Sequence, residues 1–320
     1  MISTSMMYQQ QTNIINSSNQ KWLSAGLSLS TMKRVVNPSD DALAASQAVR
    51  LQQSLGLNAQ YSTARSFAQS SIALSENVMQ NVNTNLIEIK TTIVNAGNGT
   101  MSDEDREILA NKLEGLKSEL LGLANTRDGL GNYIFSGFKT DTVPFVEDAS
   151  GVIVYQGGDT PISQKVEAQR ELNVSFLGDD IFVGMPSNPI EEPDGTPSGV
   201  NGVFDTLDKL IAVLKTPTTA GQPAFDALGD ALATANRGIT NAIENIGRVQ
   251  TEMGLSLREL DNLDDLGAQQ KLAGQERISD LVDLDAAKGI SDYMLNLNSL
   301  QASYQTFMDM KGLSLFSLAR

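Results

Sequence analysis

The sequence contains no cysteine and no histidine in 320 residues. Without cysteine there is no disulfide, thiolate nucleophile or iron–sulfur ligand, and without histidine the commonest general base and transition-metal ligand is missing. Carboxylates remain able to act as acids, bases or ligands of hard cations, so catalysis is disfavoured rather than excluded. The length allows one large domain or two to three modest ones.

Basic side chains are also scarce, with 23 against 38 acidic ones and a net charge of −15. Binding to nucleic acid depends on neutralising phosphates with Lys and Arg, and anionic membrane surfaces attract basic segments. We therefore expect neither a nucleic-acid nor a membrane partner. No run approaches the roughly 18 apolar residues of a membrane span. Residues 1–19 lack the basic start and apolar stretch of a secretory signal, which leaves export of an unfolded chain without a cleaved signal open.

Proline is nearly absent from both ends of the chain, since eight of the nine prolines lie between positions 144 and 223. Helix interiors exclude proline, so both flanks can form long helices and the middle cannot. Charge follows the same division. Residues 137–202 hold 3 basic and 11 acidic side chains, a net −8, whereas residues 1–45 total +1 and residues 277–320 total −1.

The flanks show the alternating three- and four-residue spacing of a heptad repeat. Such a repeat keeps one apolar seam facing a partner helix, as in a coiled coil, although periodicity alone leaves an ordinary helical bundle open. The four seams are Ile72, Ser75, Met79, Val82, Leu86, Ile89 and Ile93; Leu109, Leu113, Leu116, Leu120 and Leu123; Ile239, Ile243, Ile246, Gln250, Met253, Leu257 and Leu260; and Ile290, Tyr293, Leu297, Leu300, Tyr304 and Phe307.

Local signals predict where the helices begin and end. The turn at 37–41 places Ser39 or Asp40 as the N-cap of a helix that opens at Ala42 and runs to about Asn95. A glycine-containing segment at 97–99 then ends it. Ser102 caps a second helix, with Asp105 completing a capping box three residues later, and Gly129 and Gly131 end that helix. A further amphipathic helix is predicted from Val203 to Lys215.

The middle of the chain is typical of β structure. Three short β-prone runs at 152–155, 172–176 and 181–183 are separated by Gly, Pro and Asp, with a turn at 156–159 and a loop over 184–202. The sequence therefore predicts a mainly α fold, a discontinuous coiled-coil-like helical rod formed by the N- and C-terminal segments, with an inserted β-rich domain. The predicted parts are terminal helices at 1–45 and 277–320, rod segments at 46–136 and 203–276, and the insert at 137–202.

Clusters of acidic residues are the only candidates for chemistry. They are Asp179 with Asp180, Glu191 and Glu192 with Asp194, Asp264 with Asp265, and Asp280 with Asp283 and Asp285. None has the spacing of an EF-hand loop, and paired catalytic carboxylates need a gap that only the fold can set. Gly129-Leu130-Gly131 lacks the context of a nucleotide-binding loop. We predict no catalytic, cofactor-binding or metal-binding residue, and no cofactor.

The two ends combine amphipathic spacing with many Ser, Gln and Asn side chains. Segments 1–35 and 290–320 bury too little apolar surface alone to offset the entropy of ordering. We expect them to fold on assembly, with residues 1–40 and 285–320 protease-sensitive in the monomer and protected once assembled. Frayed termini are the alternative.

Several terminal motifs resemble those of the flagellin family of axial proteins. Ile2–Tyr8 is similar to the family's start, and Leu23-Ser24-Ala25-Gly26 followed by Asn37–Asp41 resembles its Leu-Ser-(Thr/Ser)-Gly and Pro-Ser-Asp-Asp signatures. Asn98-Gly99-Thr100 before Asp105-Arg106, together with Ile278–Asp285 and Leu300–Ser303, resembles further family segments. The resemblance covers about residues 1–137 and 236–320.

The segment Leu123-Ala124-Asn125 with Gly131–Gly137 resembles the junction type of the family more than filament flagellin, which usually has a shorter Phe-Asn-Gly element there. The ending Gly312–Phe316 also fits the junction type. Two residues depart from the family pattern, Ala25 where Thr is common and Ala42 where Pro often follows the paired Asp. Proline at a first helical position helps to start a helix, so Ala42 loosens that start slightly.

This resemblance implies a structural subunit and not an enzyme. Such subunits are exported unfolded through the flagellar type III channel with a chaperone, and are extracellular in the flagellum. They form a ring by self-assembly between the hook-side junction protein (hook-associated protein 1) and flagellin. The terminal helices would form the inner tube, with the rod outside it and the insert facing solvent. A filament flagellin is the alternative, and an exported hydrolase or metal-binding adhesin carried on the insert is a remote one.

Overall fold

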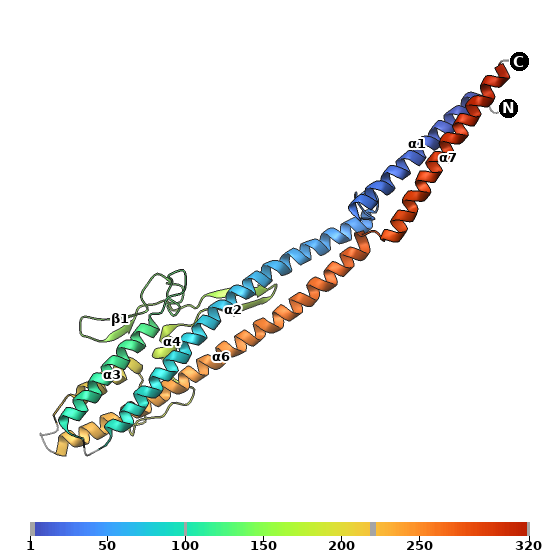
Figure 1. The fold of residues 1–320 in the computed structure, drawn as a ribbon. Helices are drawn as coiled ribbons and strands as arrows, with labels where there is room; N and C mark the ends of the chain where they lie inside the picture. Colours follow the sequence, from blue (N-terminus) through green and yellow to red (C-terminus); the bar gives the residue numbers. More distant parts are fainter. Residues whose placement is uncertain (1–3, 99–100, 218–221, 319–320) are drawn as a thin grey trace. The chain divides into compact units, whose positions relative to one another are not determined.

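The computed structural model describes residues 4–98, 101–217 and 222–318, which form helices α1–α7 and strands β1–β4 (Figure 1). The chain divides into two compact units. Unit 1 combines Met1–Ala59 with Leu266–Arg320, and unit 2 is Gln60–Asp265. The two ends of the sequence therefore fold together, as the paired seams predict. No helix within the described residues is long and apolar enough to cross a membrane.

Unit 1 is built from helices that lie far apart in the sequence. It contains α1 (Thr4–Thr31) and α7 (Ala286–Leu318), which run side by side, together with the first part of α2 (Ala42–Ala96) and the last part of α6 (Gln222–Val282) (Figure 1). The end of α1 is tied to the end of α6 by backbone hydrogen bonds. The Arg34 amide donates to the Val282 carbonyl at 2.7 Å, and the Leu284 amide donates to the Met32 carbonyl at 3.0 Å.

Unit 2 contains the hydrophobic core, which is formed by the rest of α2 and α6 with α3 (Asp103–Ala124) and α5 (Val203–Leu214). The first predicted seam is confirmed, because all seven of its residues from Ile72 to Ile93 are at most 2% exposed. The seams on α3 and α6 are confirmed as well, since every member is buried or half-buried. Ser75 and Gln250 occupy seam positions despite their polarity, and the Ser75 hydroxyl donates to the Ser71 carbonyl at 3.1 Å.

Helix α2 begins at Ala42 as predicted, but its N-cap is not one of the two predicted residues. The predicted caps were Ser39 or Asp40, whereas the Asp41 carboxylate accepts the Ala44 amide at 3.0 Å. Asp40 instead accepts the amides of Val36 and Asn37, at 3.1 Å and 2.8 Å, and so closes the preceding turn. With three adjacent polar residues in Ser-Asp-Asp, the choice of cap depends on this turn, which the sequence does not specify.

The predicted start of α3 is confirmed in detail, whereas the predicted end is wrong. Ser102 and Asp105 form the predicted capping box. The helix ends at Ala124, before the predicted stop at Gly129 and Gly131. The cause is Asn125, whose amide group donates to the Phe145 carbonyl at 2.9 Å and accepts the Phe145 amide at 3.0 Å. The chain leaves the helix where this contact with a strand 20 residues away becomes available.

The middle segment contains two separate two-stranded antiparallel hairpins. β1 (Phe145–Glu147) pairs with β2 (Ile153–Tyr155), and β3 (Ser163–Glu167) pairs with β4 (Arg170–Asn173). The run at 152–155 is thus largely a strand, and the run at 172–176 is a strand only to Asn173. Strands β1 and β3 were not predicted. All four strands of the described residues lie in this middle segment, which is a small strand-containing insertion between the helical segments.

The predicted strand at 181–183 is wrong, because Gly178–Phe182 forms the short helix α4. Asp179 and Asp180 lie in its first turn, where carboxylates favour a helix. The Asn245 amide of α6 donates to the Asp180 and Ile181 carbonyls at 2.7 Å and 3.1 Å, so these groups need no neighbouring strand. Gly178 permits this packing, since a Cβ there would lie 2.6 Å from the Phe145 ring.

A cluster of four phenylalanines joins α4 and β1 to the helices. Phe145 lies 5.2 Å from Phe182 and 5.5 Å from Phe204 between ring centroids, and Phe182 lies 6.0 Å from Phe135. All four rings are at most 3% exposed. Aromatic pairs at these separations add about 0.5–1.5 kcal/mol each to the burial of their surface.

The observed fold class is that of the prediction, N- and C-terminal helical segments with a small strand-containing insertion. The helix predicted from Val203 to Lys215 is confirmed as α5, which ends one residue earlier at Leu214. The two compact units do not test the predicted three-part division, and the boundaries at 45, 136, 202 and 276 stay predictions.

Candidate functional site

The α1–α7 pair in unit 1 is the first candidate site. Both helices turn a heptad row toward each other, consisting of Tyr8, Gln11, Ile15, Ser18, Trp22, Ala25 and Leu29 on α1, and of Gly289, Tyr293, Asn296, Leu300, Ser303, Phe307 and Met310 on α7. Alternate positions are large and apolar, whereas most of those between them are small or polar. The pair is therefore a coiled-coil seam with only about half of its usual apolar content.

Two aromatic contacts hold the ends of this seam. Tyr8 meets Phe307 edge-on at 5.9 Å between centroids, and Trp22 lies 6.1 Å from Tyr293. These pairings make α1 and α7 antiparallel. Gly26 faces the Tyr293 ring, and a Cβ at that position would make an ordinary van der Waals contact with it at 3.4 Å. Trp22 is the only tryptophan of the chain.

A polar cluster occupies the seam between these aromatic contacts. The Gln11 side-chain amide donates to the Ser303 carbonyl at 3.1 Å, and the Ser18 and Ser303 hydroxyls lie 3.4 Å apart. All three residues are 9% exposed. Polar groups in a helix seam reduce stability but favour one register, because a slip leaves them buried without partners.

Two of the six members of the predicted terminal seam are misplaced, whereas Tyr293, Leu297, Leu300 and Phe307 are buried or half-buried as predicted. Ile290 and Tyr304 were predicted to face inward, but they are 51% and 50% exposed. Gly289 and Ser303 occupy the inward positions beside them. Periodicity follows the large apolar residues, so it misses inward positions that are occupied by small or polar residues.

The outward faces of α1 and α7 carry many large apolar side chains that are 42% or more exposed. They are Met6, Met7, Ile14, Leu23 and Leu27 on α1, and Ile290, Met294, Leu295, Tyr304 and Met308 on α7. Isolated exposed hydrophobes are normal, but gathered on a two-helix element they mark an interaction surface. We call these ten residues the outer apolar face. Sequence periodicity found Ile290 and Tyr304 only as seam members and did not single out the other eight.

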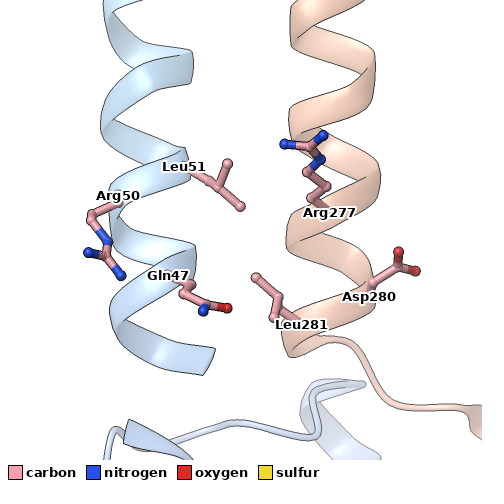
Figure 2. Close-up of a pocket in the computed structure, with 6 residues that line it drawn as sticks. All are labelled: Gln47, Arg50, Leu51, Arg277, Asp280 and Leu281. Carbon is pink, nitrogen blue, oxygen red and sulfur yellow. The ribbon is translucent and has the colours of Figure 1, made fainter. Parts of the chain in front are cut away.

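A second feature of unit 1 is an open groove of about 530 Å³ between α2 and α6. It is lined by Gln47, Arg50, Leu51, Arg277, Asp280 and Leu281 (Figure 2). Figure 2 shows Gln47 and Leu51 of α2 and Leu281 of α6 directed into the space between the helices. No sequence pattern predicts this groove, because it depends on the separation of two helical segments more than 200 residues apart in the chain.

The acidic clusters have structural partners where the fold places them. Asp264 pairs with Arg65 at 2.6 Å, Glu192 pairs with Arg237, and the Asp285 carboxylate accepts the Ala287 amide at 2.9 Å at the start of α7. Asp179 and Asp180 lie near Tyr155, whose pKa is raised to about 12 by burial and then by these two charges.

The clusters do not converge on a metal site, since the described residues hold no group of three acidic, His or Cys side chains placed to bind a metal. Gly129-Leu130-Gly131 forms a turn in which the Asp128 carboxylate accepts the Leu130 and Asn132 amides at 2.9 Å and 2.8 Å. These hydrogen bonds lower the Asp128 pKa against the opposing effect of burial. That the chain has no catalytic or binding residue of this kind stays a prediction.

Paired terminal helices with an apolar outer face, joined through a largely helical middle, define a flagellin-like assembly subunit. A family profile described as "Bacterial flagellin N-terminal helical region" matches residues 2–140. The chain is 46% identical over 318 residues to flagellar hook-associated protein 3 of Escherichia coli (strain K12), and this match covers 99% of each of the two chains. The chain belongs to the flagellar hook-associated protein 3 family.

Other comparisons agree. The chain is 43% identical over 319 residues to flagellar hook-associated protein 3 of Salmonella typhimurium, covering 100% of this chain and 99% of that one. Among solved structures, the flagellar junction protein FlgL from Legionella pneumophila matches with a TM-score of 0.62 at 20% identity, covering 74% of this chain and 100% of its own. Xanthomonas campestris FlgL matches with a TM-score of 0.61 at 17% identity, covering 72% and 99%. At these identities the structures support the fold.

Proposed function

We propose that this chain is a structural subunit of the bacterial flagellum that forms the junction ring between hook and filament. The observation that carries the proposal is the end-to-end identity of 46% with flagellar hook-associated protein 3. The outer apolar face supplies a physical basis for assembly, because its side chains remain in water in a single copy. Burying them between copies releases about 25 cal/mol for each Å² of apolar surface removed from water.

The proposed partners are further copies of this chain, the hook-side junction protein (hook-associated protein 1) and flagellin. The terminal segments 1–45 and 277–320 would form the inner tube of the ring. Segments 46–136 and 203–276 would form the rod outside it, and the insert at 137–202 would face solvent. The net charge of −8 on the insert and the near-neutral ends support this layering, since close packing of many copies disfavours like charges.

The proposed route to the flagellum is export of the unfolded chain through the flagellar type III channel, with an export chaperone as partner. Two features support it. The chain has no cysteine that would lock it by a disulfide, and the weakly apolar seam of α1 and α7 opens at low cost. The resulting location is extracellular, on the flagellum.

We further propose that the protein has no catalytic role, since its relatives bear the names of flagellar assembly components rather than enzymes. The rival proposal, a hydrolase or metal-binding adhesin, has its best candidate at Asp179 and Asp180. Calorimetry with Ca²⁺ on the wild type and on Asp179→Asn tests it. Heat of binding that disappears in the variant would favour the rival.

Deletion of the gene tests the main proposal. We expect cells with hooks, without filaments and with flagellin shed into the medium, and restoration of filaments by the wild-type gene. Normal filaments on the deletion strain would refute a junction role. Filament flagellin, the alternative within the family, predicts instead that purified monomers polymerise alone into long fibres.

A further inference from the structure

Two arginines that line the groove between α2 and α6 lack an ion-pair partner within the described residues. Arg50 comes from α2 and Arg277 from α6, and both residues are exposed. Figure 2 shows Arg277 on the side of α6 that faces α2, and Arg50 on the outer side of α2. Two other arginines, Arg34 and Arg65, do have partners. Arg34 bonds to Asp41 at 3.1 Å and to the Leu281 carbonyl at 2.6 Å, and Arg65 pairs with Asp264 at 2.6 Å. The groove arginines are thus available to carboxylates from outside.

The groove also has an apolar lining. Leu51 and Leu281 are half-buried on its two sides, and Gln47 adds an amide that can donate or accept. Guanidinium groups bind carboxylates through two parallel hydrogen bonds, whereas leucines select an apolar side chain. The chemistry that fits is therefore a segment with carboxylates flanking an apolar residue. Asp280 lies at the rim, and Figure 2 shows its carboxylate on the side of α6 away from α2.

The charge of the chain is divided unequally between its two units. Unit 1 holds 9 basic and 8 acidic side chains, a net +1, which leaves 14 basic and 30 acidic side chains, a net −16, in unit 2. A second copy of the chain thus presents one strongly acidic unit, and the groove lies in the unit without excess acid. Complementary potentials of this kind steer association and suppress wrong registers.

We propose that the groove binds an acidic segment of unit 2 from a second copy of this chain. This inference rests on the proposed ring assembly and names one of its contacts. Because the groove and the acidic unit are different surfaces, the contact is heterologous and repeats from copy to copy, as an assembly around an axis requires. The contact is distinct from the outer apolar face, which lies on α1 and α7.

Site-directed cross-linking tests the identity of the occupant. A benzophenone amino acid replaces Gln47, which points into the groove, and in a second variant replaces Asp280 at its rim. Cells assemble flagella, the hook–filament complexes are isolated and irradiated, and cross-linked peptides are sequenced. We expect the partner peptide to come from residues 60–265 of a second copy. Peptides from another protein, from unit 1 of a second copy, or no cross-link from either position, would overturn the proposal.

Charge reversal tests the arginines. Arg50→Glu with Arg277→Glu should reduce the cross-link yield about tenfold, the effect of losing two partly exposed ion pairs. Two further variants separate charge from position. Lys271→Glu changes an exposed α6 residue outside the groove lining and should leave the yield unchanged, whereas Arg50→Gln with Arg277→Gln should give an intermediate yield. Equal yields from the wild type and the double Glu variant would contradict a role for the arginines.

The same preparations separate this inference from the proposed function. If the wild-type chain is absent from isolated hook–filament complexes, the junction role itself fails. If the wild type is present there and the cross-links map outside residues 60–265, the junction role stands and only the groove proposal is overturned. Circular dichroism of each variant checks that the helices of unit 1 are retained.

Discussion

Single buried polar side chains connect distant parts of unit 2. Arg65 on α2 is 3% exposed, and its guanidinium donates to the Asp264 carboxylate at 2.6 Å and to the Val166 carbonyl of β3 at 3.2 Å. The Ser71 hydroxyl donates to the Val174 carbonyl at 3.0 Å, just beyond β4. The second hairpin is thus held to α2 by side chains that a hydrophobic pattern does not reveal.

Replacing Arg65 by methionine keeps most of the volume and removes these bonds. We predict a loss of about 2 kcal/mol in the free energy of unfolding, because the Val166 carbonyl loses a buried donor while Asp264 can still be hydrated. Urea denaturation followed by circular dichroism measures it. Arg258→Met, at an exposed position of α6, should change the value by less than about 0.5 kcal/mol. Equal losses in the two variants would contradict the assigned role of Arg65.

The capping box of α3 makes stability depend on pH. Hydrogen bonds from the Ser102 hydroxyl and amide hold the pKa of Asp105 below its usual 3.8. A lowered folded-state pKa stabilises the fold above the unfolded pKa, and this contribution is lost as the pH falls through the folded value. Asp105→Asn should therefore be less stable than the wild type at pH 7, with the difference closing below about pH 4.

Unfolding of both proteins between pH 3 and pH 7 tests this dependence. Glu104→Gln removes a carboxylate from the same helical turn without touching the capping box, and so controls for the interaction with the helix dipole. A difference for Asp105→Asn that stays constant down to pH 3 would show that the carboxylate bonds contribute nothing specific.

At the scale of elements, the sequence predicted best where large apolar residues alone decide the packing. The seam from Ile72 to Ile93 and helix α5 were found because burial follows hydrophobic spacing there. The helix end at Ala124 and the helix at Gly178–Phe182 were missed because Asn125 and Asn245 bond to backbone groups far away in the sequence. Such partners become visible only once the chain has folded.

The residues of the candidate site were not predicted from the sequence. Amphipathic terminal segments pointed to assembly, yet Gly289 and Ser303 take the inward positions that were predicted for Ile290 and Tyr304. Ile290 and Tyr304 therefore belong to the outer apolar face, and the groove depends on distances between helices that no local pattern encodes. The ion pairs that Asp264 forms with Arg65 and that Glu192 forms with Arg237 could not be foreseen, because these partners lie far away in the sequence.

The outer apolar face predicts a variant that separates assembly from folding. Leu295 on α7 is 67% exposed, and Leu295→Gln should change the unfolding free energy of the monomer by less than about 0.5 kcal/mol while reducing the number of filaments per cell. Ile108→Gln, at a 65% exposed position of α3, is the matched control and should preserve filaments. Wild-type filament numbers in both variants would argue against the outer apolar face as an assembly surface.

At the scale of the whole molecule, the hydrophobic core belongs to one unit. Its buried residues run from Ala68 to Leu260, all inside unit 2, whereas unit 1 depends on thin helix-to-helix seams. A domain with its own core can fold alone. The two units should therefore differ in stability, with local opening favoured in unit 1 because it has fewer buried apolar contacts.

A fragment of residues 60–265 tests this division. We predict that it remains folded, with a urea midpoint close to the main transition of the full chain. The full chain should show in addition an earlier change in the fluorescence of Trp22, which reports only on unit 1. A fragment without helical signal, or a Trp22 transition that coincides with the main one, would show that the units unfold together.

The polar cluster of α1 and α7 also has a consequence for the order of events in folding. Gln11 and its partner Ser303 are 292 positions apart, so their hydrogen bond closes a loop that contains nearly the whole chain. Contacts between residues so far apart in the sequence form late in folding, because the entropic cost of closing the loop arises before the contact contributes any stabilisation. A chain that lacks its last few dozen residues leaves the inner row of α1 without a partner. The α1–α7 pair can therefore form only in a full-length chain, in which both terminal helices are present.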